Sequence, residues 1–477
     1  MPISVLPDEV LLAVFDFCMD MDHHPTDDLL LSVVDRGKRK KESWQRLVHV
    51  CRHWRSLVFG SPRRLDLHLV CTTKTPAMDT LDIWPPLPLI IWWRGGDLYW
   101  GSVENVIAVL EHSDRVRRIT LRGVPSWLLG DFSDAMQATF PELTCLEIDS
   151  FGTAVPALPD SFLGGSAPRL ESLWLERVPF PGLPNLLMSA PRLVGLRLDD
   201  IPHPGYISPE AMVTALSTLT RLGSLSLALQ PPQSHPGQAS RRAPPPTRSV
   251  LPALTYFCFK GATEYLEDLV ARIDVPRLDD LNLILFYDQV VFDAPQFAQF
   301  VSRTPQFKAL EKARIIFKDV AASIKFSSRT SGYRRFYVKI PCAELDWQVS
   351  SLQNVCNSWS PPLSSLEDLY IYEAPHSRRW HNIASTPWLE LLHPFTAVKN
   401  LYLTEEFAPR IIPALQELVG DRTTEVLPAL RNMFIEEFEP GPAQEGIRQF
   451  VDARLLAGHH VAFSRWDRKK RVEKVDD

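Results

Sequence analysis

Apolar residues near the start of the chain recur at helical spacing. Within the run LPDEVLLAVF, Leu6, Val10, Leu11, Val14 and Phe15 fall on one face of a predicted helix. A proline at the first helical position and two acidic residues behind it mark the start of this helix. The proline lacks an N–H that would be unpaired there, and the carboxylates favour the positive end of the helix dipole.

A second predicted helix follows after a charged stretch. Its apolar stripe consists of Trp44, Leu47, Val48, Cys51, Trp54 and Val58, with Arg55 at its edge, and it ends before Gly60 and Pro62. Two amphipathic helices of this size need an apolar surface to cover them. The pattern therefore predicts a small helical region over residues 1–60 that packs against something else.

The rest of the chain repeats a pattern of the form LxxLxL, in which other apolar residues sometimes replace a leucine. Its first positions are Val116, Leu143, Leu170, Leu193, Leu222, Leu254, Leu278, Leu310, Leu366, Val398 and Leu430. Successive copies lie 23 to 32 residues apart, except for one interval of 56 that Tyr333, Phe336 and Val338 divide into 23 and 33. Weaker copies begin at Leu87 and Pro62.

This spacing resembles irregular leucine-rich repeats, although the asparagine that usually follows the strand is absent. Each copy predicts a short strand with inward leucines and outward variable residues, and segments such as PEAMVTALSTLT predict helices between strands. No unit can bury its own apolar face, so the units are expected to stack into an α/β solenoid with parallel strands on the concave face. A doubly wound α/β enzyme is the alternative.

The pattern divides the chain into three parts. The helical region at 1–60 holds an insertion at 20–42, and the solenoid over 61–440 holds a proline-rich loop at 230–249 that is predicted to be disordered. Residues 441–477 are expected to form a C-terminal cap helix and a charged tail.

Composition narrows the cellular setting. A net charge of −6 and a pI near 6.1 give no general basic field, so we expect no nucleic-acid partner. Seven cysteines without a CxxC pair argue against a disulfide framework and favour the reducing cytoplasm or nucleus. The longest apolar run, LPLIIWW, is far shorter than the ~20 residues that span a bilayer, so we expect no membrane partner.

Signals of chemistry are weak. The sequence holds no GxGxxG, P-loop, HExxH or GxSxG motif, and its paired histidines lack further ligands at useful spacing. We therefore expect no enzyme activity, no metal and no cofactor. The basic clusters RGKRKK and RWDRKKR are interpreted either as nuclear-import signals or as solvated charge.

The first sixty residues resemble the F-box family, and the continuation FGSPRRLDLHLVC resembles the expanded F-box group of mushroom-forming fungi. The resemblance rests on Leu6-Pro7, Glu9 and the later run Val50-Cys51-Arg52-x-Trp54-Arg55, whereas the insertion at 20–42 departs from the compact domain. It implies a non-catalytic substrate-recognition subunit of an SCF-type ubiquitin ligase, which binds the Skp adaptor and through it a cullin scaffold. The implied adaptor-binding residues are Leu6, Pro7, Val10, Val14, Phe15, Cys51 and Trp54.

The solenoid is expected to bind a target protein, since outward residues on its strands are free to vary. The candidate contacts are Tyr370, Tyr372, Tyr402, Phe434, Glu147 and Glu176. The alternative for the aromatic residues is that they pack against one another or under a C-terminal cap. The alternative function is a stand-alone leucine-rich-repeat scaffold without a link to a ligase, and adaptor binding distinguishes the two.

Overall fold

The computed structural model describes most of the chain, in two compact units formed by Met1–Tyr206 and Ile207–Asp477. The described residues are 6–20, 44–62, 64–72, 81–95, 100–230, 247–285, 294–328, 335–358, 363, 365–373, 385–418, 420–436 and 442–466. The predicted insertion after residue 20, positions 231–246 of the predicted loop and the tail from 467 onward lie outside them.

The first unit opens with helices that pack on each other. Helix α1 (Asp8–Asp20) and helix α3 (Arg52–Gly60) are joined through Phe15 and Trp54, whose ring centroids lie 4.7 Å apart. Helix α3 begins at Cys51, whose sulfur accepts a hydrogen bond from the Trp54 backbone N–H at 3.4 Å. A helical turn at 44–48 carries Trp44, which is buried against Phe59 and Trp84.

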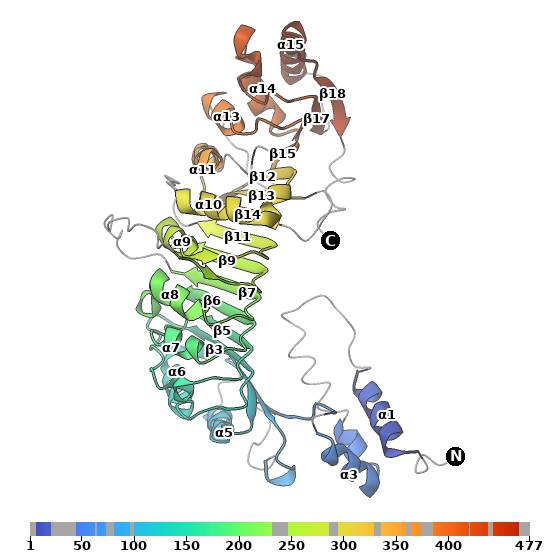
Figure 1. Cartoon of the computed structure of the whole chain (residues 1–477), viewed down its shortest axis with the longest axis vertical. Coiled ribbons are helices and arrows are strands. Elements are labelled where there is room, and N and C mark those ends of the chain that lie inside the picture. The colour runs from blue at the N-terminus through green and yellow to red at the C-terminus, as the bar shows by residue number, and fades with distance from the viewer. Residues whose placement is uncertain are drawn as a thin grey trace. The chain divides into compact units, whose positions relative to one another are not determined.

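The remainder of the first unit is a parallel sheet in chain order (Figure 1). Its strands are β1 (Leu69–Thr72), β2 (Leu89–Arg94), β3 (Val116–Pro125), β4 (Cys145–Phe151), β5 (Ser172–Glu176) and β6 (Gly195–Ile201). The connections hold α5 (Trp100–Leu110), α6 (Ser126–Ala135), the 3₁₀ turn η2 (Phe162–Gly165) and α7 (Leu183–Met188), and the 3₁₀ turn η3 (His203–Gly205) follows β6. Alternate strand residues are buried; Leu173 and Leu175 of β5 are examples.

The second unit continues the same alternation of strand and helix. Its strands are β7 (Ser224–Leu229), β9 (Tyr256–Gly261), β11 (Asp280–Leu285), β12 (Lys312–Lys318), β13 (Ala321–Ser327), β14 (Arg335–Pro341), β15 (Asp368–Glu373), β16 (Asn400–Leu403), β17 (Asn432–Glu436) and β18 (Ala462–Trp466). A separate small sheet pairs β8 (Ser249–Val250) with β10 (Ile273–Asp274). The helices are α8 (Pro209–Leu216), α9 (Thr263–Val270), α10 (Pro295–Arg303), α11 (Leu345–Ser358), α13 (Ser385–Leu392), α14 (Ala408–Gln416) and α15 (Pro442–Leu456), with 3₁₀ turns η4 (Pro305–Ala309) and η5 (Gly420–Thr424).

The predicted strand positions are confirmed from Leu87 to Leu430, because a strand begins two residues after the first position of each LxxLxL copy, except at Val116, where the strand begins at that residue. The copy predicted at Pro62 is wrong, since the first strand begins at Leu69. The buried side chains of Leu65 and Leu67 enter the core before this strand, and Asp66 between them has φ +45°, which turns the backbone out of an extended path.

The regular order of the sheet is interrupted once in the second unit. Strands β12, β13 and β14 form an antiparallel meander, so the order in space is β11-β14-β13-β12-β15. The strand predicted around Phe336 exists as β14, but it lies beside β11 instead of following β12. Only two residues, Asp319 and Val320, join β12 to β13, and a connection this short permits an antiparallel hairpin but no parallel crossover.

We expect Ile324→Ala to lower the free energy of unfolding by about 2–5 kcal/mol. Ile324 lies in the middle strand of the meander, fully buried and in register with Ile315 and Val338 on either side. Urea unfolding followed by fluorescence measures the change. Val320→Ala, at the exposed hairpin turn, is the control and is expected to change stability by less than about 0.5 kcal/mol. If Ile324→Ala unfolds at the same urea concentration as the wild type, β13 does not form the buried middle strand of the meander.

Candidate protein-interaction surfaces

Helix α1 carries apolar side chains on two opposite faces. Leu11, Leu12 and Phe15 are buried on one face, where the Phe15 ring packs on Trp54 of α3. On the other face, Val10 and Val14 are each 43% exposed and Phe17 is 63% exposed. We call the exposed set Leu6, Val10, Val14 and Phe17 the α1 stripe. A helix that is apolar on both sides is typical of one that is buried on both sides, and the described part of the chain covers only one of them.

The residues predicted to bind the adaptor separate into two groups. Leu6, Pro7, Val10, Val14 and Cys51 are exposed. Phe15 is fully buried and Trp54 is partly buried against it, so these two rings hold the helices together. The helix turns the Phe15 ring toward α3, so this residue supports the helix pair from inside the chain, and adaptor contact by the predicted residues stays a prediction.

The sequence interpretation missed two exposed apolar residues beside this group. Phe17 lies three positions after Val14 on the same helical face, and Val50, which is 59% exposed, directly precedes Cys51. Helical spacing from Val10 and Val14 would have found Phe17.

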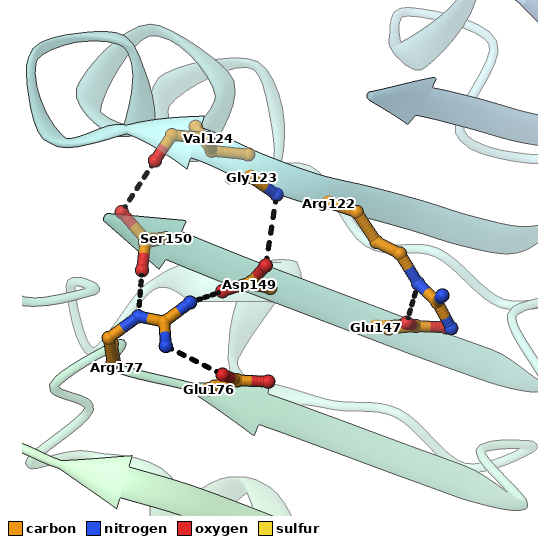
Figure 2. Close-up of polar contacts among 8 residues, drawn as sticks. All are labelled: Arg122, Gly123, Val124, Glu147, Asp149, Ser150, Glu176 and Arg177. Atoms are coloured by element: carbon orange, nitrogen blue, oxygen red, sulfur yellow. Dashed lines mark hydrogen bonds and ion pairs between the residues drawn. The ribbon is translucent and has the colours of Figure 1, made fainter. Parts of the chain in front are cut away.

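The outward face of the strands in the first unit carries a network of paired charges (Figure 2). The Arg177 guanidinium donates to Asp149, to Glu176 at 2.7 Å and to the Ser150 carbonyl at 2.7 Å. Arg122 of β3 donates to Glu147 of β4 in the same view. The structure therefore places Glu147 and Glu176, both predicted as target contacts, among arginines that neutralise much of their charge.

An indole lies between two of the arginines on this face. Trp174 of β5 has the Arg197 guanidinium 4.2 Å and the Arg122 guanidinium 5.2 Å from its ring centroid. Both distances fall in the range of cation–π attraction. The two arginines and the indole were not among the predicted target contacts, although Trp174 and Arg197 lie in direct register with Glu147 on the outward side and Arg122 lies two residues after Thr120, the β3 residue in that row.

Backbone conformation helps to hold the network. Gly123 has φ +63°, and its N–H donates to the Asp149 carboxylate at 3.1 Å. Arg177 also has a positive φ of +57°, and its N–H donates to the Asp199 carbonyl at 2.8 Å. Burial, and then the nearby carboxylate of Asp149, raises the pKa of Glu176 above its ordinary value. The arrangement offers a partner a set of polar groups that are already fixed in position.

The aromatic residues of the second unit form one stack, as predicted. The Tyr370 and Tyr402 centroids lie 4.2 Å apart and those of Tyr402 and Phe434 lie 4.5 Å apart, with ring planes within 7° of parallel. They come from neighbouring strands in direct register. Burial raises the pKa of the Tyr370 hydroxyl.

The structure bears out the alternative in which these rings pack against one another under a C-terminal cap, and not their exposure. Tyr370 and Tyr372 are each 7% exposed and Tyr402 is 4% exposed. The reason is strand β18, which the repeat pattern did not predict and which brings Trp466 edge-on over the two stacked tyrosines. The Trp466 indole N–H donates to the Leu403 carbonyl at 3.1 Å, which fixes the cover in place. The aromatic stack is therefore part of the core of the second unit.

Other features bear on the chemistry of the surface. All seven cysteines are free thiols. Within the described ranges, no group of three or more His, Cys, Asp or Glu side chains is placed to hold a metal ion. No described helix is both long and apolar enough to cross a membrane.

No family model and no curated protein matches the chain. Among solved structures, TLR13 in its complex with ssRNA13 is similar at 13% identity and a TM-score of 0.30, over 77% of this chain and 45% of that one. The leucine-rich-repeat-containing protein LegL7 from Legionella pneumophila is similar at 12% identity and a TM-score of 0.27, over 80% of this chain and 97% of that one. The chain spans less than half the length of TLR13.

The parallel strands, their connecting helices and their shared apolar row show the fold. The chain is an α/β solenoid of the leucine-rich-repeat type. The assignment rests on the strand register and the repeat spacing of the chain itself.

We expect Trp466→Ala to destabilise the C-terminal strands by about 3–5 kcal/mol, the usual cost of removing a buried aromatic side chain. The loss would expose the stacked tyrosines, so thermal unfolding and tyrosine accessibility should change together. Trp347→Ala, which truncates an exposed indole on α11, is the matched control and should leave both readouts close to wild type. Equal melting of the two variants would contradict the covering role of Trp466.

The raised pKa of Glu176 predicts a pH-dependent effect of Glu176→Gln. A carboxyl whose pKa is higher in the folded state holds its proton more tightly there, so its contribution to stability falls as pH rises from the ordinary carboxyl range through the folded pKa. Glu176→Gln removes this loss of stability, because glutamine does not ionise. Relative to wild type, the variant should gain stability from pH 4 to pH 7 and be at least as stable at pH 7.

Denaturant titrations at several pH values provide the test. The control is Glu142→Gln, which removes a half-exposed partner of Arg169 and should change stability by about 0–1 kcal/mol. A Glu176→Gln variant that weakens relative to wild type as pH rises would show that the pairing with Arg177 outweighs burial and repulsion.

Proposed function

We propose that the chain is the substrate-recognition subunit of an SCF-type ubiquitin ligase. In this proposal the helices α1 and α3 bind a Skp adaptor, which connects the chain to a cullin scaffold, and the solenoid captures a target protein. The single observation that carries it is the α1 stripe, an exposed apolar row on a helix whose opposite face is already packed.

The energetics of the stripe favour a protein partner. Four large apolar side chains in one row expose area that gains roughly 25 cal/mol per Å² when it is buried. Helices that present such rows commonly dock into apolar grooves, with side chains at i, i+4 and i+7 as anchors. Val10, Val14 and Phe17 have this spacing, and Pro7 at the start lacks an N–H that would otherwise be unpaired there. The sequence of Leu6–Phe15 and Val50–Arg55 resembles F-box proteins, and for this reason we propose a Skp adaptor as the partner.

In this proposal the solenoid binds the target protein. Its outward strand residues differ from repeat to repeat, whereas its inward residues are mostly apolar. In the first unit these outward residues include the network around Arg177 and the Trp174 indole, which we assign to target contact. The chain itself carries out no covalent step, and free thiols agree with work in the reducing cytoplasm or nucleus.

A stand-alone interaction scaffold is the second candidate. The same solenoid surface supports it, and the α1 stripe then covers a different partner or another part of a larger assembly. Binding of a Skp adaptor decides between the two functions.

We expect Val10→Asp with Val14→Asp to weaken capture of a purified Skp adaptor by more than tenfold, because truncation or charge at a buried hot spot commonly costs over about 2 kcal/mol. Both side chains point away from the α1–α3 core, so circular dichroism should show an unchanged fold. Surface-immobilised full chain and purified adaptor provide the measurement.

The matched control is Val320→Asp, the same substitution at an exposed valine of the β12–β13 turn. It should bind the adaptor as the wild type does. If the double variant also retains full adaptor capture, the ligase proposal fails and the scaffold function is favoured. If the wild-type chain fails to bind the adaptor, the same conclusion follows.

A further inference from the structure

The meander that interrupts the solenoid has an unusual charge. Its three strands contain six Lys and Arg residues and no Asp or Glu, in a chain with 51 basic and 57 acidic residues. We call these six residues, together with Tyr337 and Ser323, the meander face. The six are Lys312, Arg314, Lys318, Lys325, Arg335 and Lys339.

Strand alternation directs all six to the same side. The inward positions of β12, β13 and β14 are apolar and buried, as shown by Ile315, Ile324 and Val338, which lie in one register. The basic residues occupy the positions between them. They therefore stand on the outward side of the sheet. Arg314 is buried there at 3% exposure, with its guanidinium 5.8 Å from the Tyr370 ring centroid, so the other five supply the accessible charge.

The register places like charges next to each other. Arg314 lies directly opposite Lys325 in the antiparallel pair, where Cβ atoms are about 5 Å apart and like charges repel. Carboxylates flank the amino-terminal half of the face, with Asp280 beside Arg335 and Asp368 beside Lys312.

The other half has fewer acidic neighbours. Lys339 lies beside Ile284 of β11 and Ser323 of β13 in the register, and the one nearby carboxylate in the hairpin turn is Asp319. The carboxyl end of β14 and the β12–β13 turn thus hold Lys339 and Lys318, with Asp319 as the carboxylate of the turn.

An independent observation at the same place points to a missing acceptor. Ser323 lies on the outward row between Lys339 and Ile316, and its side chain is only 2% exposed. Its hydroxyl oxygen has no hydrogen-bond partner. A buried polar group without a partner costs about 1–3 kcal/mol, and an acceptor supplied by a ligand would remove that cost.

We propose that the meander face binds an Asp/Glu-rich, extended segment of the target protein. The charges are spread over three strands about 4.8 Å apart and along each strand, so they match carboxylates distributed along a chain better than one compact anion. Tyr337, next to Lys325 in register, adds an apolar surface between the cations. The inference deepens the proposed function by naming the chemistry of the target, and it rests on that function only in assigning target capture to the solenoid.

The acidic balance of the whole chain favours a short segment over a long polyanion. With a net charge of −6, the protein repels an extended nucleic acid outside this local face. The recognition is expected to weaken as salt rises, because exposed charges are screened.

The test uses the full chain and a short fluorescein-labelled peptide of alternating Glu, Asp and Gly, followed by fluorescence anisotropy. Lys325→Gln with Lys339→Gln should weaken binding by about tenfold or more. Arg277→Gln with Lys308→Gln removes the same charge from exposed sites off the strands and is the matched control, with affinity expected within about twofold of wild type. A Gln/Asn version of the peptide should not bind.

Ser323→Ala separates a binding role from a structural one. Removing a hydroxyl without a partner should leave the melting temperature unchanged or higher, while the acidic peptide binds several-fold more weakly. A variant that binds the peptide as the wild type does would remove Ser323 from the site.

The proposal is overturned if the wild type does not bind the Asp/Glu peptide, or if the Lys325/Lys339 variant binds it equally well. It is also overturned if binding requires phosphoserine in place of the carboxylates. If oligouridylate RNA binds more tightly through the same lysines, the face binds nucleic acid instead. Adaptor capture is measured on the same variants and should stay at the wild-type level, so failure here is distinguishable from failure of the α1 stripe to bind Skp.

Discussion

Burial of one shared apolar row is the constraint on which the structure depends. A single strand such as β5 cannot cover Leu173 and Leu175, and both are nearly inaccessible because neighbouring strands and helices complete the core. This requirement fixes every second residue of a strand. The residues between them face the other side and do not line this row, and the functional chemistry of the chain is expected there.

The outward face uses this freedom in three different ways. In the first unit, arginines and carboxylates pair around Trp174 and give a preformed polar surface. In the second unit, the meander gathers positive charge, whereas the following strands stack tyrosines beneath Trp466. The last arrangement is stabilising because aromatic pairs in parallel-displaced or edge contact add to the area they bury. Whether an outward residue belongs to the surface or to the core thus depends on whether another part of the chain covers it.

The sequence predicted the repeated parallel strands of this fold, but little of the antiparallel meander or of the C-terminal strand. Each LxxLxL copy from Leu87 onward located a strand, since inward leucines repeat wherever the core continues. The β13 strand was missed because it has period-two alternation without a leucine repeat, and its antiparallel place depends on the short turn at Val320. A C-terminal cap over the aromatic residues was one alternative, but the pattern did not single out Trp466, because its place depends on a contact with Leu403, 63 residues away in sequence. Among the predicted site residues, Glu147 was located on the correct face, but its arginine partner comes from another strand.

The central proposal is that another protein covers the exposed face of α1. Its most direct test is hydrogen exchange of the full chain, measured with and without a purified Skp adaptor. The account predicts slower exchange in peptides from Leu6 to Asp20 when the adaptor is present, because docking suppresses fraying of a helix with one uncovered face. Peptides from Lys312 to Pro341 should exchange at the same rate in both samples. Unchanged exchange over Leu6 to Asp20 at saturating adaptor, or protection confined to the solenoid, would contradict the account.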